Sequence, residues 1–358
     1  AKEIVGNESQ ERMGLVMKQE NVDLLSQIAS RERAPMYVIG EATGTHQFTI
    51  VNDKTGEKPI DLQMDDMIGN PPKTIMKDST VEETFKPLNV NEENIYEYLN
   101  QVLQLESVAC KDYLTNKVDR SVTGKIATQQ CTGELQLPLN DCGVVAIDYQ
   151  GVKGIATSIG HAPAVGLISP ENGSIMSIAE ALTNVVLTPI EGGLKGISLS
   201  ANWMWPCKNA GEDARLYRAV QAASDFAKAL QINIPTGKDS LSMTQKYKVG
   251  DSVYSPGTVI ISTVGEVQDI RKTVTPFIKP DEDAVLVYVD FGKSGQKLGG
   301  SALAQVVNGL GTETPTVTDP AYFAKAFNAV QKLVAEGKVL AGHDVSAGGL
   351  ITCLLEMN

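Results

Sequence analysis

Residues 174–187 read SIMSIAEALTNVVL, and this apolar stretch is the strongest indication of the fold around it. We predict a helix here, because the apolar residues leave few positions exposed to solvent. A second helix is predicted over 213–230, and Glu212 and Asp213 lie at its positive dipole end. Apolar strands and glycine-rich loops surround both helices over residues 109–267. This region therefore reads as one mixed domain.

Strands and helices also alternate after residue 275. The run AVLVYVD at 284–290 is continuously apolar, which is typical of a strand buried on both faces. A glycine-rich loop, a helix from Ser301, a helix over 320–336 and a strand over 338–341 are predicted to follow. This alternation argues for α/β or α+β packing.

The N-terminal third reads as the tail of an α+β unit that is too short for a full core. We predict a linker over 70–92, where Pro71 and Pro72 interrupt a charged stretch with little periodicity. The elements predicted around this linker are a helix within 8–28, strands over 35–41, 46–51 and 60–62, and a helix over 91–105.

Composition excludes several classes of protein. The chain has 358 residues, which favours two or more domains, and its 42% hydrophobic and 21% charged residues exclude wholesale disorder and a coiled-coil rod. Lys and Arg total 31 against 43 Asp and Glu, so we expect no nucleic-acid partner. No apolar run approaches the roughly 20 residues of a membrane span, so no membrane partner is expected.

Cysteine and histidine usage also bounds the function. Five scattered cysteines without a C-x-x-C pair predict a reduced, cytoplasmic protein with buried thiols. Three histidines disfavour a multi-histidine zinc site. The C-terminus falls within an apparently amphipathic helix, so we expect the chain to be a segment of a longer polypeptide.

Three short acidic motifs carry oxygen ligands. Asp141 ends the run 137–141, before a strand predicted over 143–148. Glu180 and Asn184 are four residues apart, so both can offer oxygens to one cation from one helical face. Asp344, in GHDVSAGG at 342–349, follows a predicted strand, and such a loop suits Mg²⁺ and phosphate oxygens.

Each motif also has a purely structural interpretation. Asp141 suits a turn, and Glu180 with Asn184 suits a solvated helical face. Asp344 suits the N-cap of a following helix. None of the three motifs indicates a function by itself.

Together with other motifs, they resemble a known family. The chain resembles the interior of the large, single-chain phosphoribosylformylglycinamidine synthases of purine biosynthesis. The resemblance covers essentially the whole chain and rests on GNESQER at 6–12, VIGEAT at 38–43, VDRSVTG at 118–124, EALTN at 180–184, LSANWM at 199–204, PTGKDSLSM at 235–243 and HDVS at 343–346.

The resemblance implies an α+β fold built from domains similar to those of aminoimidazole ribonucleotide synthetase, called PurM-like. Residues 1–90 resemble the end of a first PurM-like C-domain, and 91–105 a linker helix. Residues 106–275 resemble a second N-domain, and 276–358 the start of a second C-domain. The family's first N-domain, with its catalytic histidine, and its glutaminase domain are expected outside this chain. No catalytic residue is therefore expected within it.

The resemblance also implies the reaction and the ligands. The family converts formylglycinamide ribonucleotide, ATP and glutamine to formylglycinamidine ribonucleotide, a C–N ligase reaction that uses a glutamine amidotransferase domain. The residues that resemble its Mg²⁺ ligands are Asp141, Glu180, Asn184 and Asp344. Those that resemble its ATP/ADP contacts are Lys111, Asn140 and Ser346. In the family this second nucleotide is largely a retained, structural ADP.

The sequence departs from the family at one position, and it leaves two interpretations of the chain's role open. The family often has Asp after the Ser of its His-Asp-x-Ser motif, whereas this chain has Ala347, which is expected to loosen the cation site. The chain is either a ligase core that binds nucleotide or a non-catalytic scaffold. In both cases we expect it to be inactive alone, even with ammonia. We also expect a homodimer through residues 106–275, because 143–148 and 259–264 would leave an unpaired edge or face.

Overall fold

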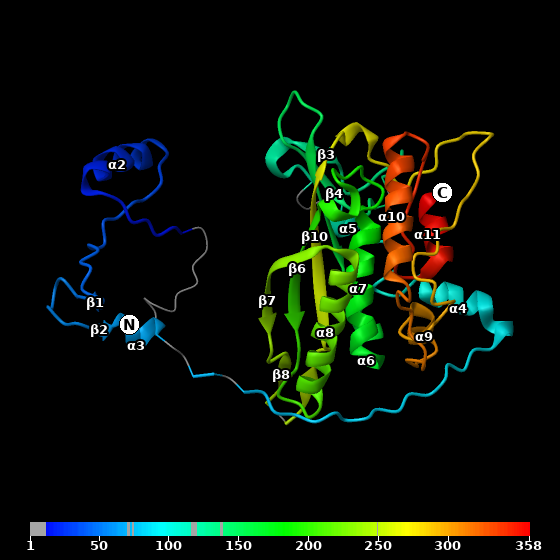
Figure 1. Ribbon diagram of the computed structural model, residues 1–358, viewed down its shortest axis with the longest axis horizontal. Coiled ribbons are helices and arrows are strands. Elements are labelled where there is room, and N and C mark those ends of the chain that lie inside the picture. Colours follow the sequence, from blue (N-terminus) through cyan, green and yellow to red (C-terminus); the bar gives the residue numbers. More distant parts are fainter. Residues whose placement is uncertain (1–11, 70–71, 74, 116–119, 137–138, 249) are drawn as a thin grey trace. The chain divides into compact units, whose positions relative to one another are not determined.

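The computed structural model describes residues 12–69, 72–73, 75–115, 120–136, 139–248 and 250–358. The chain divides into two compact units, Ala1–Ile75 and Met76–Asn358 (Figure 1). The beginning of the predicted helix within 8–28 and parts of the motifs at 6–12, 118–124 and 137–141 lie outside the described residues.

The first unit is small and open. Its described elements are η1 (Gln19–Asn21), α2 (Val22–Arg31), β1 (Gln47–Ile50), β2 (Ile60–Gln63) and α3 (Met64–Ile68). β1 and β2 form an antiparallel hairpin in which Phe48 faces Leu62. None of the residues described in this unit is buried. This agrees with the prediction that the segment is too short to form a core.

The second unit is built on a six-stranded sheet of order β3-β4-β5-β10-β6-β7. Its neighbouring strands are antiparallel except β6 and β7, which are parallel and are connected through α8. The bounds of the sheet strands are β3 (Ile126–Thr128), β4 (Gly143–Ala146), β5 (Gly154–Gly160), β6 (Ile197–Met204), β7 (Asn233–Ser240) and β10 (Thr258–Val267). A separate hairpin consists of β8 (Thr244–Lys246) and β9 (Ser252–Tyr254).

Helices cover one face of this sheet (Figure 1). The α-helices described in this unit are α4 (Ile95–Val102), α5 (Asp112–Thr115), α6 (Pro163–Ile168), α7 (Pro170–Val185), α8 (Glu212–Leu230), α9 (Ala302–Val306), α10 (Pro320–Ala335) and α11 (Gly349–Met357). The 3₁₀ helices are η2 (Glu92–Asn94), η3 (Val122–Gly124), η4 (Gly193–Gly196) and η5 (Ile270–Lys272). The predicted helices over 174–187, 213–230 and 320–336 are confirmed within a few residues.

Helix α7 begins earlier than predicted because of its capping residues. The Ser169 hydroxyl accepts a hydrogen bond from the Asn172 backbone N–H at 3.1 Å, and Pro170 occupies the first turn. A serine N-cap followed by proline at the first helical position satisfies and preorganises a helix start. The helix therefore extends four residues before Ser174.

The core joins the sheet, α7 and α10. Ile178, Leu182 and Val185 of α7 are fully buried, as are Phe323 and Phe327 of α10. Because α10 follows residue 276, the two predicted PurM-like regions share one apolar core. Burying each such side chain stabilises the fold by about 1.5–3 kcal/mol.

The opposite face of the sheet is exposed along its central strands. In β5 buried and exposed residues alternate, and the side chains of Ile155 and Ile159 are 42% and 59% exposed. Val264 of β10 is 44% exposed on the same side. We predicted an unpaired edge or face, and of these the edge is excluded, because 259–264 lies in β10, which pairs with both β5 and β6. The exposed feature is therefore an apolar face and not an edge.

Three runs that were predicted as strands form none: 35–41, 284–290 and 338–341. The run 284–290 was expected to be buried, yet Val285 is 81% exposed and Leu286 is 69% exposed. An apolar sequence makes a strand only where another strand satisfies its N–H and C=O groups. In the described residues none of these runs has such a partner.

Gly160 provides a test of the packing between β5 and α7. A Cβ at this position would lie 2.2 Å from the Ala181 backbone N and 2.3 Å from Ser177 O. We expect Gly160→Ala to lower the free energy of unfolding by roughly 1–3 kcal/mol, because helix and strand must separate. Chemical denaturation measures this change.

Gly143→Ala is the matched control, since Gly143 lies in β4 and a Cβ there would meet only Thr157 Oγ1 at 3.6 Å. We expect this variant to be unchanged or stabilised by up to about 1 kcal/mol. Equal stabilities of the two variants would contradict the close approach of α7 to β5.

Candidate functional site: a buried acidic cluster

Asp141 and His343 are in contact although they are 202 residues apart in sequence. Asp141 lies just before β4, and His343 lies in the loop between α10 and α11. His343 Nδ1 donates to Asp141 Oδ1 at 2.5 Å, and the Asp344 backbone N–H donates to Asp141 Oδ2 at 3.3 Å. The Asp141 side chain is only 5% exposed, so the contact lies inside the unit.

His343 connects this aspartate to α11. Its Nε2 lies 2.8 Å from Glu356 Oε2. Burial alone would lower the pKa of His343, but the hydrogen bonds to Asp141 and Glu356 outweigh burial and raise it to about 10. His343 is therefore a cation at neutral pH, held between two carboxylates.

Glu180 brings a third carboxylate from α7. The Ser346 hydroxyl donates a hydrogen bond to Glu180 Oε1. Burial raises the pKa of Glu180, the Ser346 bond opposes this rise, and the charge of nearby Asp141 adds to it. Glu180 consequently faces the cluster and not solvent, so the interpretation of this residue as a solvated helical position was wrong.

Asp344 has one carboxylate oxygen near a cation and one without a partner: its Oδ1 lies 3.9 Å from His343 Nδ1. Its side chain is 6% exposed, and its Oδ2 is buried without a hydrogen-bond partner. Burial raises the pKa of Asp344 well above its ordinary value, and the charges of Glu180 and Asp141 raise it further. A buried carboxylate oxygen without a partner is costly, so Oδ2 indicates that a proton or a cation completes the cluster.

The loop that carries Asp344 ends in glycines for a conformational reason. Gly348 has a φ of +89° and is the N-cap of α11. A Cβ there would lie 2.2 Å from Thr352 Oγ1. The interpretation of Asp344 as a helix N-cap was therefore wrong. Ala347 lies in this turn and is exposed.

Three further predicted residues donate hydrogen bonds to backbone oxygens outside the acidic cluster: Asn184, Asn140 and Lys111. Asn184 Nδ2 donates to Ile159 O at 2.9 Å, which leaves its carbonyl oxygen for another partner. Asn140 Nδ2 donates to Gln129 O at 2.6 Å, and its Oδ1 is buried without a partner. Lys111 Nζ donates to Ala109 O at 3.0 Å, a local contact that does not involve the acidic cluster.

Sequence reasoning missed two members of the cluster, His343 and Glu356. His343 was noted only as part of a motif, although its position next to Asp344 was a usable signal. No local signal marked Glu356, which reaches the cluster because α11 returns the chain toward the loop. The two side chains meet at 2.8 Å.

These residues fit a hard divalent cation. Carboxylate oxygens are the ligands that Mg²⁺ prefers. Ligand atoms of Asp141 and Asp344 lie within 4.8 Å of each other. The His343 imidazolium is not counted as a ligand, because both its ring nitrogens are bonded to carboxylates. The buried, unpartnered Oδ2 of Asp344 supplies a free oxygen at this point. A cation here would offset the burial and the mutual repulsion that together raise the pKa values of the carboxylates.

Two family profiles match the second unit. Residues 110–266 match the FGAR-AT PurM_N-like domain, and residues 281–358 match the C-terminal domain of AIR synthase related proteins. The chain is also 40% identical over its full length to phosphoribosylformylglycinamidine synthase of Dictyostelium discoideum. The chain belongs to this synthase family. The predicted PurM-like α+β fold is thereby confirmed.

A plant member of the synthase family is equally similar. The chain is 39% identical to the probable phosphoribosylformylglycinamidine synthase, chloroplastic/mitochondrial, of Arabidopsis thaliana, over 99% of its length. It spans 27% of the Dictyostelium protein and 26% of the Arabidopsis protein. The solved structure titled T. maritima PurL complexed with ATP matches with 16% identity and a TM-score of 0.48, covering 75% of this chain and 39% of that one.

When divalent cations are absent, the pKa shifts in the cluster predict that the stability of the chain depends on pH. His343 and the carboxylates of Asp141, Glu180 and Asp344 hold protons more tightly in the folded chain than in the unfolded chain. The folded state thus binds more protons, and the free energy of unfolding falls as pH rises. The contribution of His343 is complete below its ordinary pKa of 6.5 and is lost as pH rises through about 10.

We expect denaturation in a chelator to show a loss on the order of 2 kcal/mol between about pH 6.5 and pH 9.5. His343→Gln should reduce this loss, whereas His161→Gln, outside the cluster, should not. An equal pH dependence in all three proteins would show that His343 does not carry the charge.

Proposed function

We propose that the chain is the part of a phosphoribosylformylglycinamidine synthase that contains its second PurM-like N-domain. In this proposal residues 1–90 end the first C-domain, 91–105 form a linker helix, 106–275 form the N-domain and 276–358 begin the second C-domain. The full-length similarity to synthases several times longer supports the assignment. The whole protein would convert formylglycinamide ribonucleotide, glutamine and ATP in purine biosynthesis.

Cysteine usage supports a reducing compartment, and we propose the cytoplasm. Cys131 and Cys353 are buried as expected, whereas Cys110 is exposed. An exposed free thiol persists most readily where glutathione keeps thiols reduced. Among the described helices none is both long and apolar enough to cross a membrane.

The role of this segment in the proposal is to hold a magnesium nucleotide. Asp141, Glu180, Asn184 and Asp344 would hold Mg²⁺, and Lys111, Asn140 and Ser346 would contact ATP or ADP. The observation that carries the proposal is the buried, unpartnered Oδ2 of Asp344 among carboxylates from both parts of the second unit. The unpartnered Oδ1 of Asn140, next to Asp141, suggests a hydrogen-bond donor on the ligand.

Magnesium, when bound, neutralises phosphate oxygens and fixes their orientation. The chain's own contribution is to bring the carboxylates together before the ligand arrives. Ser346 orients Glu180, and His343 orients Asp141. Such hydrogen bonds to ligand groups normally support both metal affinity and geometry.

A second candidate function is a non-catalytic scaffold without nucleotide. The observation that favours it is the His343 imidazolium, which lies between Asp141 and Glu356 and already supplies one positive charge. With protons on both Asp344 and Glu180, the His343 imidazolium would face only the charges of Asp141 and Glu356, and the cluster would need no metal. In both cases the first N-domain would be needed for turnover, so we propose that this chain alone is inactive, even with ammonia.

Calorimetric titration with MgADP distinguishes the two candidates. We expect saturable binding to the wild-type chain, and at least tenfold weaker binding to Asp344→Asn, because the amide keeps the shape but removes a ligand charge. Asp225→Asn, on the exposed side of α8, is the control and should bind as wild type. Absence of saturable MgADP binding would favour the scaffold.

We also propose a homodimer through the exposed face of the sheet in residues 106–275. The support is the apolar exposure of Ile155, Ile159 and Val264 on neighbouring strands. Contiguous exposed apolar side chains mark interaction surfaces, and a twofold pair of identical faces closes on itself.

Light scattering tests the dimer at high micromolar concentration. We expect twice the chain mass of 38.3 kDa for the wild-type chain and the monomer mass for Ile159→Lys, which places a charge in the face. Tyr217→Lys, at an exposed position on α8, should leave the mass unchanged. A strictly monomeric wild-type chain would contradict the dimer.

A further inference from the structure

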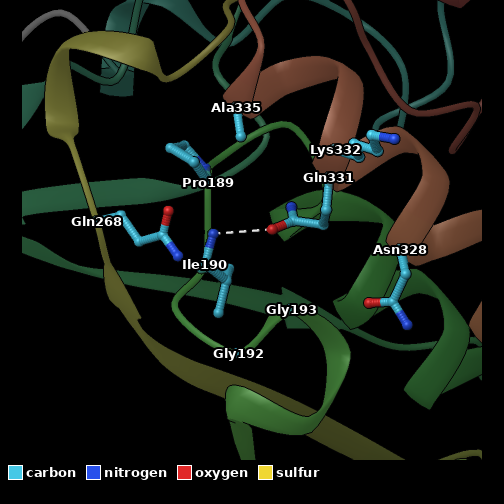
Figure 2. A pocket seen from close by; sticks show the side chains of 9 residues that line it. All are labelled: Pro189, Ile190, Gly192, Gly193, Gln268, Asn328, Gln331, Lys332 and Ala335. Atoms are coloured by element: carbon cyan, nitrogen blue, oxygen red, sulfur yellow. Dashed lines mark hydrogen bonds between the residues drawn. The ribbon is translucent and has the colours of Figure 1, made fainter.

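Gln331 of α10 has a contact pattern unlike that of a typical polar helix residue. It is 6% exposed, and its whole amide group is hydrogen-bonded. Its Nε2 donates to Val186 O at 2.6 Å and to Thr188 O at 2.7 Å, while its Oε1 accepts from the Ile190 N–H at 2.8 Å. Figure 2 shows the last bond at the wall of a shallow cavity.

The three partners of Gln331 lie in one short segment, residues 186–190, which we call the hinge link. It follows α7 directly and leads toward η4. The backbone of the hinge link also receives hydrogen bonds from elsewhere: Val274 N donates to Leu187 O at 2.9 Å, and Gln268 N donates to Pro189 O at 3.0 Å. The link is therefore a buried segment whose backbone carbonyl oxygens accept hydrogen bonds from several distant parts of the chain.

The hinge link contacts both sides of the acidic cluster. On one side, Thr188 Oγ1 lies 3.2 Å from the Sγ of Cys142, the residue after Asp141. On the other side, the Leu187 side chain packs on Gly342, the residue before His343, where a Cβ would lie 2.8 Å from Leu187 Cδ2. A shift of this link would consequently move Asp141 relative to Asp344.

We propose that Gln331 is a positioning residue for the cation site. By fixing α10 on the hinge link, it sets the register between the part of the chain that carries Asp141 and Glu180 and the part that carries Asp344. A glutamine suits this role because its planar amide offers two donors and one acceptor in fixed directions. The proposal rests on the proposed cation-binding function of the cluster.

Asn328 provides a matched control on the same helix. Its Oδ1 accepts from the Leu194 N–H at 3.1 Å, which also joins α10 to the N-domain region. Leu194 lies beyond the hinge link, and this bond does not lead to the acidic cluster. Loss of either residue removes side-chain hydrogen bonds between α10 and the N-domain region. Comparing the two variants therefore separates an effect on the position of the acidic cluster from a general loss of stability.

The first measurement is the affinity for Mn²⁺, followed by electron paramagnetic resonance of the free ion. The variants are Gln331→Met, Asn328→Ala and the milder Gln331→Asn, all in the full 358-residue chain at a temperature where each is folded. We expect about tenfold weaker binding in the Gln331 variants, the low end of losses seen when supporting residues are removed. Asn328→Ala should bind within twofold of wild type. Equal losses in the Gln331 and Asn328 variants would overturn the proposal.

The second measurement, hydrogen exchange of the Asp344 amide, does not depend on cation binding. This N–H donates to Asp141 Oδ2, so its exchange rate reports the position of Asp344 relative to Asp141. We expect at least tenfold faster exchange in the Gln331 variants than in Asn328→Ala, in a chelator. If wild type binds no Mn²⁺ but this difference appears, the cation site is wrong and the positioning role stands. If the exchange rates are equal, the positioning role is wrong.

Discussion

Helix α7 is buried on the side that faces the six-stranded sheet and again where it packs against α8, and the rest of the second unit depends on this packing. Ile178, Leu182 and Val185 are fully removed from solvent, together with Phe323 and Phe327 of α10. The glycine at position 160 lets β5 approach the α7 backbone. Because the same helix carries Glu180, the packing that forms the core also places a carboxylate at the site.

The acidic cluster is electrostatically unfavourable, because the packing of the chain buries several carboxylates close together. Asp141, Glu180 and Asp344 come from three distant parts of the chain, and burial raises the pKa of each. One imidazolium, that of His343, offsets part of the repulsion, yet Oδ2 of Asp344 stays unpartnered. Because protein groups alone do not satisfy this oxygen, the cluster supports the proposal of a bound cation.

The two faces of the sheet have different roles. One face carries α7 and α8 and forms the core, while the other exposes Ile155 and Ile159 along a central strand. Alternation along a strand normally places polar residues on a solvated face. Apolar residues on that face therefore support the proposed contact with a second copy of the chain.

The sequence by itself determined the elements whose stability is local. The periodicity of 174–187, 213–230 and 320–336 predicted helices that are present, because an amphipathic helix satisfies its own backbone hydrogen bonds. The motifs also identified the family and three carboxylates of the acidic cluster, Asp141, Glu180 and Asp344. Only the tertiary structure decided that 284–290 makes no strand, since a strand depends on a partner that the run itself does not contain. Only the tertiary structure brought Glu356 to His343 and Gln331 to the hinge link, because such contacts depend on how distant segments pack and not on local residue patterns.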